Sequence, residues 1–271
     1  MFGSLKRVLA GGLTVAVVAA ALALPASPAA AQQRNRTNAP GGWGSAILIQ
    51  NVGTATLAPD QYSIDFYDSS GNLVKSFTPP SGASIAPGAS REFYIPTTIT
   101  DLASGQYSGV VSSSVPVKAV VNSSTDRAAQ APWSAFSYEG IDAAETATKL
   151  FFPGFYKDYF GFRSELVIQN TGTSAANVQA TFYRSSDGQR YGPFNLGTIQ
   201  PNAAQTFAYN DSAFSQLPGG TSTSLFGVVI ESTNGVPLAG VSNIWTASDA
   251  DAGVASFNAF TSGSPTVYAA A

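Results

Sequence analysis

The sequence predicts an all-β protein made of two tandem immunoglobulin-like antiparallel β-sandwich domains. The first reason is a duplication: residues 46–139 and 165–260 carry the same pattern, and each copy is long enough to bury its own core. The second is that short apolar segments alternate with glycine and proline turns, without a sustained helical period. Six or seven strands in about 100 residues are typical of an immunoglobulin-like sandwich, and a barrel is the alternative.

The duplication is anchored by Ile49–Thr54, which returns at Ile168–Thr173 with five of its six residues unchanged. Later matches keep their order along the chain: Phe66-Tyr67 with Phe182-Tyr183, Gly109-Val110-Val111 with Gly227-Val228-Val229, and Ala135-Phe136 with Ser256-Phe257. In both anchors an asparagine precedes a glycine turn, where its side chain can bond nearby backbone. We therefore assign Asn51 and Asn170 to the fold and not to a ligand.

The N-terminus has the pattern of a secretory signal peptide. Lys6 and Arg7 precede an apolar run from Val8 to Leu24, and small residues follow up to Ala31. The pattern predicts cleavage after Ala31, so residues 1–31 would be absent from a secreted mature chain that has no membrane span. The alternative is a retained transmembrane anchor, for which the run has about the minimum length and weak hydropathy.

Composition excludes several classes of function. The chain has no histidine and no cysteine, which removes Ser-His-Asp and Cys-His catalysis and most zinc, copper and iron sites. Its net charge is −3, and it becomes −5 without Lys6 and Arg7. An acidic chain without a basic run is not expected to bind nucleic acid. No cofactor is predicted.

The first domain is predicted to span residues 43–146, after a flexible polar arm at 32–42. Alternation is clearest at Tyr62–Tyr67, where every second side chain is apolar, as in a half-buried strand. The expected strands are Ala46–Gln50, Gln61–Tyr67, Leu73–Phe77, Ser90–Ile95, Gln106–Ser112 and Val117–Asn122.

The second domain is predicted to span residues 147–263. Its expected strands are Glu165–Gln169, Gln179–Tyr183, Ala204–Tyr209, Leu225–Glu231 and Pro237–Trp245. An aromatic-rich joint at residues 150–162 precedes them. Such rings either form a platform for a sugar or a partner, or they form the seam between the domains and the first strand of the second. The candidate interface residues in this joint are Phe151, Phe152, Phe155, Tyr156, Tyr159 and Phe160.

The acidic residues form no catalytic motif. Asp68, Asp101, Asp187 and Asp211 occupy expected loops, where turn chemistry explains them. Asp249-Ala250-Asp251 is either part of a calcium site or a solvated acidic turn, and it lacks the glycine of a calcium loop. We therefore expect no enzyme activity and no metal site.

One string of residues resembles a group of secreted bacterial tandem-repeat proteins. It runs from Gly161 to Gly172 and is followed by Gly227–Val229 and Val236–Val241. The resemblance implies immunoglobulin-like β-sandwiches on the cell surface or in extracellular matrix. In that group an apolar strand precedes the Gly-aromatic pair, which is Gly161-Phe162 in the second copy and Gly42-Trp43 in the first.

The first copy departs from this pattern, because the polar arm stands where the second copy has Thr148–Phe152. The first domain is therefore expected to lack one strand. The C-terminal tail at 264–271 resembles the missing strand, and its candidate interface residues are Thr266, Val267 and Tyr268. Either this tail adds to the first domain of a neighbouring molecule, which would build a filament, or it is a frayed terminus.

These observations predict a non-enzymatic, secreted structural or adhesive protein of the cell surface or extracellular matrix. It would associate with itself or with other surface proteins, and head-to-tail strand addition would make it a filament subunit. The alternative is a carbohydrate-binding module or lectin-like protein. That function requires a planar set of exposed aromatic rings, for which Trp43, Trp133 and Trp245 are the first candidates.

Overall fold

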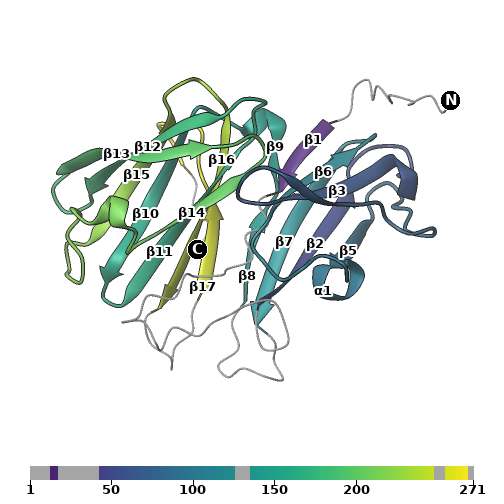
Figure 1. Ribbon diagram of the computed structural model, residues 1–271, viewed down its shortest axis with the longest axis horizontal. Helices are drawn as coiled ribbons and strands as arrows, with labels where there is room; N and C mark the ends of the chain where they lie inside the picture. The colour runs from purple at the N-terminus through teal and green to yellow at the C-terminus, as the bar shows by residue number, and fades with distance from the viewer. Residues whose placement is uncertain (1–12, 18–42, 126–134, 247–253, 268–271) are drawn as a thin grey trace.

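The protein is nearly all-β and contains several antiparallel sheets (Figure 1). A computed structural model describes residues 13–17, 43–125, 135–246 and 254–267. We call residues 13–17 and the described residues from 43 to 145 the N-terminal half, and the described residues from 147 to 267 the C-terminal half. Each half contains two groups of hydrogen-bonded strands with apolar side chains between them.

In the N-terminal half, the first sheet has the strand order β4-β3-β6-β1-β9 and the second has β5-β2-β7-β8. The first sheet comprises β1 (Leu13–Val17), β3 (Tyr62–Tyr67), β4 (Leu73–Phe77), β6 (Ser108–Ser113) and β9 (Ile141–Asp142). The second comprises β2 (Trp43–Asn51), β5 (Ser90–Tyr94), β7 (Val117–Thr125) and β8 (Ala135–Glu139). The short helices are η1 (Pro59–Gln61), α1 (Ile95–Thr98) and η2 (Ala143–Glu145).

In the C-terminal half, one strand group runs β13-β12-β15-β10, and β11 lies between β14 and β16, with β17 beyond β16. The strand β10 joins the two groups because its end forms a hairpin with β11. The elements are β10 (Lys149–Tyr159), β11 (Phe162–Asn170), β12 (Ala176–Arg184), β13 (Arg190–Ile199), β14 (Ala204–Ala208), η3 (Ser212–Phe214), β15 (Leu225–Ser232), β16 (Leu238–Thr246) and β17 (Val254–Asn258).

The two halves have the same order of strands, with β3, β6, β2 and β7 in the places of β12, β15, β11 and β16. The pairing of β3 with β6 and of β12 with β15 aligns the two halves one residue away from the sequence match of Gly109 with Gly227. Phe66 pairs with Gly109, whereas its counterpart Phe182 pairs with Val228. Val111 therefore corresponds to Ile230, because pairing keeps the core-facing residues of both strands on one face.

The place of the strand expected to be missing from the first copy is occupied by β1. In the C-terminal half, Leu150 of β10 pairs with Ile230. At the corresponding place in the N-terminal half, Val15 of β1 pairs with Val111. The segment that completes this sheet thus comes from residues 1–31, the predicted signal peptide. In Figure 1, β1 is the purple strand between β6 and β9.

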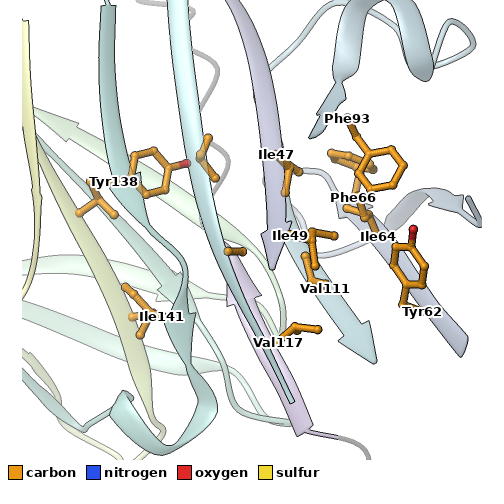
Figure 2. Close-up of a cluster of buried hydrophobic side chains, with 14 of the residues drawn as sticks. Ile47, Ile49, Tyr62, Ile64, Phe66, Phe93, Val111, Val117, Tyr138 and Ile141 are labelled. Atoms are coloured by element: carbon orange, nitrogen blue, oxygen red, sulfur yellow. The ribbon is translucent and has the colours of Figure 1, made fainter. Parts of the chain in front are cut away.

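Alternating apolar side chains fill the interior of each half. On β3, for example, Tyr62, Ile64 and Phe66 are buried while the residues between them are partly exposed. Figure 2 shows Ile49, Ile64 and Val111 gathered between strands of the two sheets. The expected strands exist with ends that shift by a few residues, and β8, β13 and β17 were not expected as strands.

Asn51 and Asn170 form the same hydrogen bonds in the two halves, and both are fully buried. The Asn51 side-chain amide donates to Ala55 O at 2.8 Å and Ile85 O at 2.9 Å, and its Oδ1 accepts from Gly53 N at 2.9 Å. The Asn170 amide donates to Ser174 O and Ile199 O, both at 2.8 Å, and its Oδ1 accepts from Gly172 N at 2.8 Å. The assignment of these residues to the fold is confirmed.

Replacing Asn170 with alanine is expected to lower the free energy of unfolding by about 1–3 kcal/mol, because the buried carbonyl of Ile199 would lose its donor. Urea unfolding of the purified protein measures this. The matched control is Asn195→Ala, which removes an exposed side-chain contact to Gly197 N and should change stability by less than about 0.5 kcal/mol. Equal effects of both substitutions would contradict the structural role of Asn170.

Candidate interaction site

The interior position of β1 marks the candidate interaction site. Five residues of β1 pair with β6, from Leu13 opposite Ser113 to Val17 opposite Gly109. Its other edge pairs with β9, through Val15 opposite Asp142 and Ala16 opposite Ile141. A strand in this position supplies hydrogen-bond partners to both neighbours, and among the described residues β9 has no other strand partner in its sheet. We call this position, between β6 and β9, the acceptor slot.

The acceptor slot is flanked by apolar side chains of the N-terminal half. Val111 of β6 is fully buried and Ile141 of β9 is 6% exposed, and both belong to the main hydrophobic cluster. In the C-terminal half the corresponding place is filled by β10, whose Leu150 and Phe152 are each 1% exposed. The slot therefore suits an extended segment with apolar residues at alternate positions.

In residues 264–267, the described part of the C-terminal tail, the expected strand is not formed. Residues 261–267 have no strand structure and are all exposed, with Val267 at 80%. The amide of Thr266 donates to Ser264 Oγ at 3.2 Å, and no backbone hydrogen bond joins residues 261–267 to a strand of the described residues. Tyr268, the remaining candidate residue of this tail, lies outside the described residues.

The aromatic residues expected at the joint have two different environments. Phe152 and Phe155 are buried in the core of the C-terminal half, where the Phe155 ring lies 5.1 Å from Phe182. Phe151, Tyr156, Tyr159 and Phe160 are partly or fully exposed. The segment therefore forms β10, the first strand of this half, and the hairpin with β11. This agrees with the interpretation that these rings belong to the first strand of the second domain.

The other part of that interpretation, a seam between the halves formed by these rings, stays a prediction. The halves meet where Phe136, Tyr138 and Ile141 join one buried cluster with Val167 and Val241 of the C-terminal half. Asn258 Nδ2 also donates to Glu139 O across this contact at 3.0 Å. The seam forms there because β11 and β16 carry small apolar side chains on the face that is turned away from their own core.

The exposed rings at the tip of the β10–β11 hairpin do not share a plane. Tyr156 is tilted by 53° against Tyr159 and by 49° against Phe162, and Tyr159 meets Phe160 at 78°. Trp43 is 2% exposed and packs 5.1 Å from Phe136, so it belongs to the core. Trp245 packs 6.0 Å from Tyr209, and Trp133 lies outside the described residues. The described rings do not form the flat platform that the carbohydrate hypothesis requires.

The loop aspartates act mainly as local turn acceptors, as the sequence predicts. Asp68 Oδ1 accepts from Ser70 N and Asn72 N, Asp187 Oδ1 from Gln189 N, and Asp211 Oδ1 from Ala213 N, all at 2.8–3.0 Å. Asp101 instead forms an ion pair with Lys75. Within the described residues, no group of three or more acidic side chains could hold a metal ion, and Asp249 and Asp251 lie outside them.

A carboxyl group that sequence analysis did not single out is buried on β11. Glu165 is fully buried, and its Oε1 accepts from Asn243 Nδ2 at 2.8 Å. Ser256 Oγ donates to Asn243 Oδ1 at 2.6 Å, which extends the chain of hydrogen bonds from β11 across β16 to β17. Burial raises the pKa of the Glu165 carboxyl to about 7, and the Asn243 hydrogen bond lowers it in part. A glutamate within an apolar strand pattern was the available signal.

We expect this group to make stability depend on pH. Because the pKa of Glu165 is higher in the folded state, the folded protein holds the proton more tightly, and the stabilisation is complete below about pH 4.5. It is lost as the pH rises to about 7, with a total on the order of 3 kcal/mol. Urea unfolding from pH 4.5 to 8 measures the loss.

Glu165→Gln keeps an acceptor for Asn243 and removes the titrating proton, so its stability should change less over this range. Glu231→Gln is the control, because this carboxylate is a surface partner of Lys149 and its side chain is 40% exposed. A wild-type pH profile in the Glu165→Gln protein would show that another group is responsible.

Comparison with known proteins gives no family. No protein-family description matches the chain, and no curated protein matches it. Among solved structures, 43% of the chain is similar to 95% of Thermotoga maritima 1070, at 18% identity and a TM-score of 0.33. The Anabaena sensory rhodopsin transducer matches 34% of the chain over 89% of its own length, at 27% identity and a TM-score of 0.28. Scores this low support no conclusion about function.

The helices are short. In the part of the chain that the structure describes, none is long and apolar enough to cross a membrane.

Proposed function

We propose that this chain is a non-enzymatic structural or adhesive protein, secreted to the cell surface or extracellular matrix, that associates with itself by strand addition. Its body would be two tandem immunoglobulin-like sandwiches. The matched strand orders of the halves and the matched Asn51 and Asn170 hydrogen bonds support this architecture. The absence of histidine and cysteine supports a role without catalysis.

The observation that carries the proposal is the origin of β1. This strand lies inside a sheet, between β6 and β9, yet its residues belong to the predicted signal peptide. Cleavage after Ala31 would remove it and leave the edges of β6 and β9 unpaired. An unpaired edge beside an apolar core is a template for another strand, and proteins that keep such an edge use it for assembly.

The energetic drive comes from two sources. The backbone groups of Gly109–Ser113 that β1 satisfies would gain protein partners again. Apolar side chains of the added strand would also pack beside Val111 and Ile141, and burying one such side chain contributes about 1.5–3 kcal/mol. Together these terms favour occupation of the slot over an open edge.

Removing residues 1–31 is therefore expected to convert a monomer into concentration-dependent assemblies. The experiment compares residues 32–271 with residues 13–271, which keep β1, by sedimentation velocity and electron microscopy. The longer chain should remain monomeric because its slot is filled in the same molecule.

The two chains share every residue from 32 onward, so a difference between them reports on β1 and its connection. If residues 32–271 fold and stay monomeric at all concentrations tested, the proposed self-association is wrong.

A further inference from the structure

We propose that the strand that replaces β1 is residues 267–271 of a second copy of this chain. The inference rests on the proposed self-association and names its donor and its register. The donor strand runs antiparallel to β6, with Tyr268 opposite Ser112 and Ala269 opposite Val111. Residues 268–271 lie outside the described residues, so the argument uses the acceptor slot, the described tail and the spacing of the sequence.

The spacing follows from equivalent backbone pairs. Ala16 pairs with Ile141 in the N-terminal half, and Phe151 pairs with Phe260 in the C-terminal half. Ile141 and Phe260 are therefore equivalent. Leu150, which fills the slot of the C-terminal half, follows Ile141 by nine positions, and Ala269 follows Phe260 by the same nine. Ala269 is therefore the residue of the tail that is equivalent to Leu150 of β10.

The tail has the chemistry that the slot requires. Val267–Ala271 is Val-Tyr-Ala-Ala-Ala, which carries no charge and no proline, and Pro265 precedes it where a strand tolerates proline. The residue of β10 equivalent to Tyr268 is Lys149, which pairs with Glu231 on the solvent-facing side of the sheet, so Tyr268 would also face solvent. Ala269 and Ala271 are smaller than the buried Leu150 and Phe152. Most of the affinity would therefore come from main-chain hydrogen bonds.

Exposed apolar side chains also lie where the tail begins and along it. Phe260 is 55% exposed, Phe151 beside it is 37% exposed, and Val267 is 80% exposed. These side chains lie where a second copy would be brought by insertion of the tail. A contact between the tail of one copy and the slot of the next is heterologous and leaves one slot and one tail free. Repetition of it builds a filament.

The test uses cross-linking, since the chain has no cysteine of its own. Residues 32–271 are prepared with Ser112→Cys in one batch and Tyr268→Cys in another, and the two are mixed and oxidised. We expect a disulfide between the two chains. The matched control is Ala269→Cys, one residue further, whose side chain would lie on the opposite face and should not cross-link to Ser112→Cys. Deleting residues 264–271 should abolish all species larger than the monomer.

The outcomes separate this inference from the proposed function. If residues 32–271 assemble but the deletion assembles equally and no Ser112–Tyr268 cross-link forms, the donor assignment is overturned while self-association stands. Cross-linking from Ala269→Cys in place of Tyr268→Cys overturns the register. In a chain that carries both Ser112→Cys and Tyr268→Cys, a disulfide within a single molecule would overturn the role of a second copy. Monomers under all conditions overturn both proposals.

Discussion

The structure depends on one requirement of β-sheets: a strand inside a sheet must find backbone partners on both edges. In the C-terminal half β15 meets this requirement with β12 and β10, which both belong to that half. In the N-terminal half β6 meets it with β3 and with β1, which comes from the extreme N-terminus. Equivalent places in the two halves are thus filled by strands of different origin, β10 in one half and β1 in the other. This difference makes the N-terminal half the place where association is expected.

The two halves share the hydrogen bonds of one buried turn and differ on the faces that meet. Asn51 and Asn170 preserve the same three hydrogen bonds, because a buried turn carbonyl needs a donor in either copy. By contrast, Ala46 occupies the place of Glu165, since both lie opposite an asparagine of the next strand. Among the described residues, a fully buried carboxyl group at this place is therefore particular to the C-terminal half. It joins β11, β16 and β17 next to the contact between the halves.

Strand positions could be predicted well where alternation was clear, as at Tyr62–Tyr67, and where the two copies supported each other, as at Glu165–Gln169, which lies within β11. The edge strand β13 was missed because Pro193 and two glycines give its sequence the composition of a turn. The slip of one residue between Gly109 and Gly227 has a similar cause. Sequence identity aligns Gly109 with Gly227. Strand pairing aligns Gly109 with Val228, because these residues lie opposite the equivalent residues Phe66 and Phe182.

The sequence by itself determined the predominance of β-strands, the turn role of the paired asparagines and the place where the first copy has no apolar segment directly before its Gly-aromatic pair. All of these follow from local patterns of side chains along the chain. Only the tertiary structure decided which segment fills that place, which aromatic rings are buried and where the halves meet. Such choices depend on contacts between residues far apart in the chain, and the periodicity of a single segment carries no information about its partner.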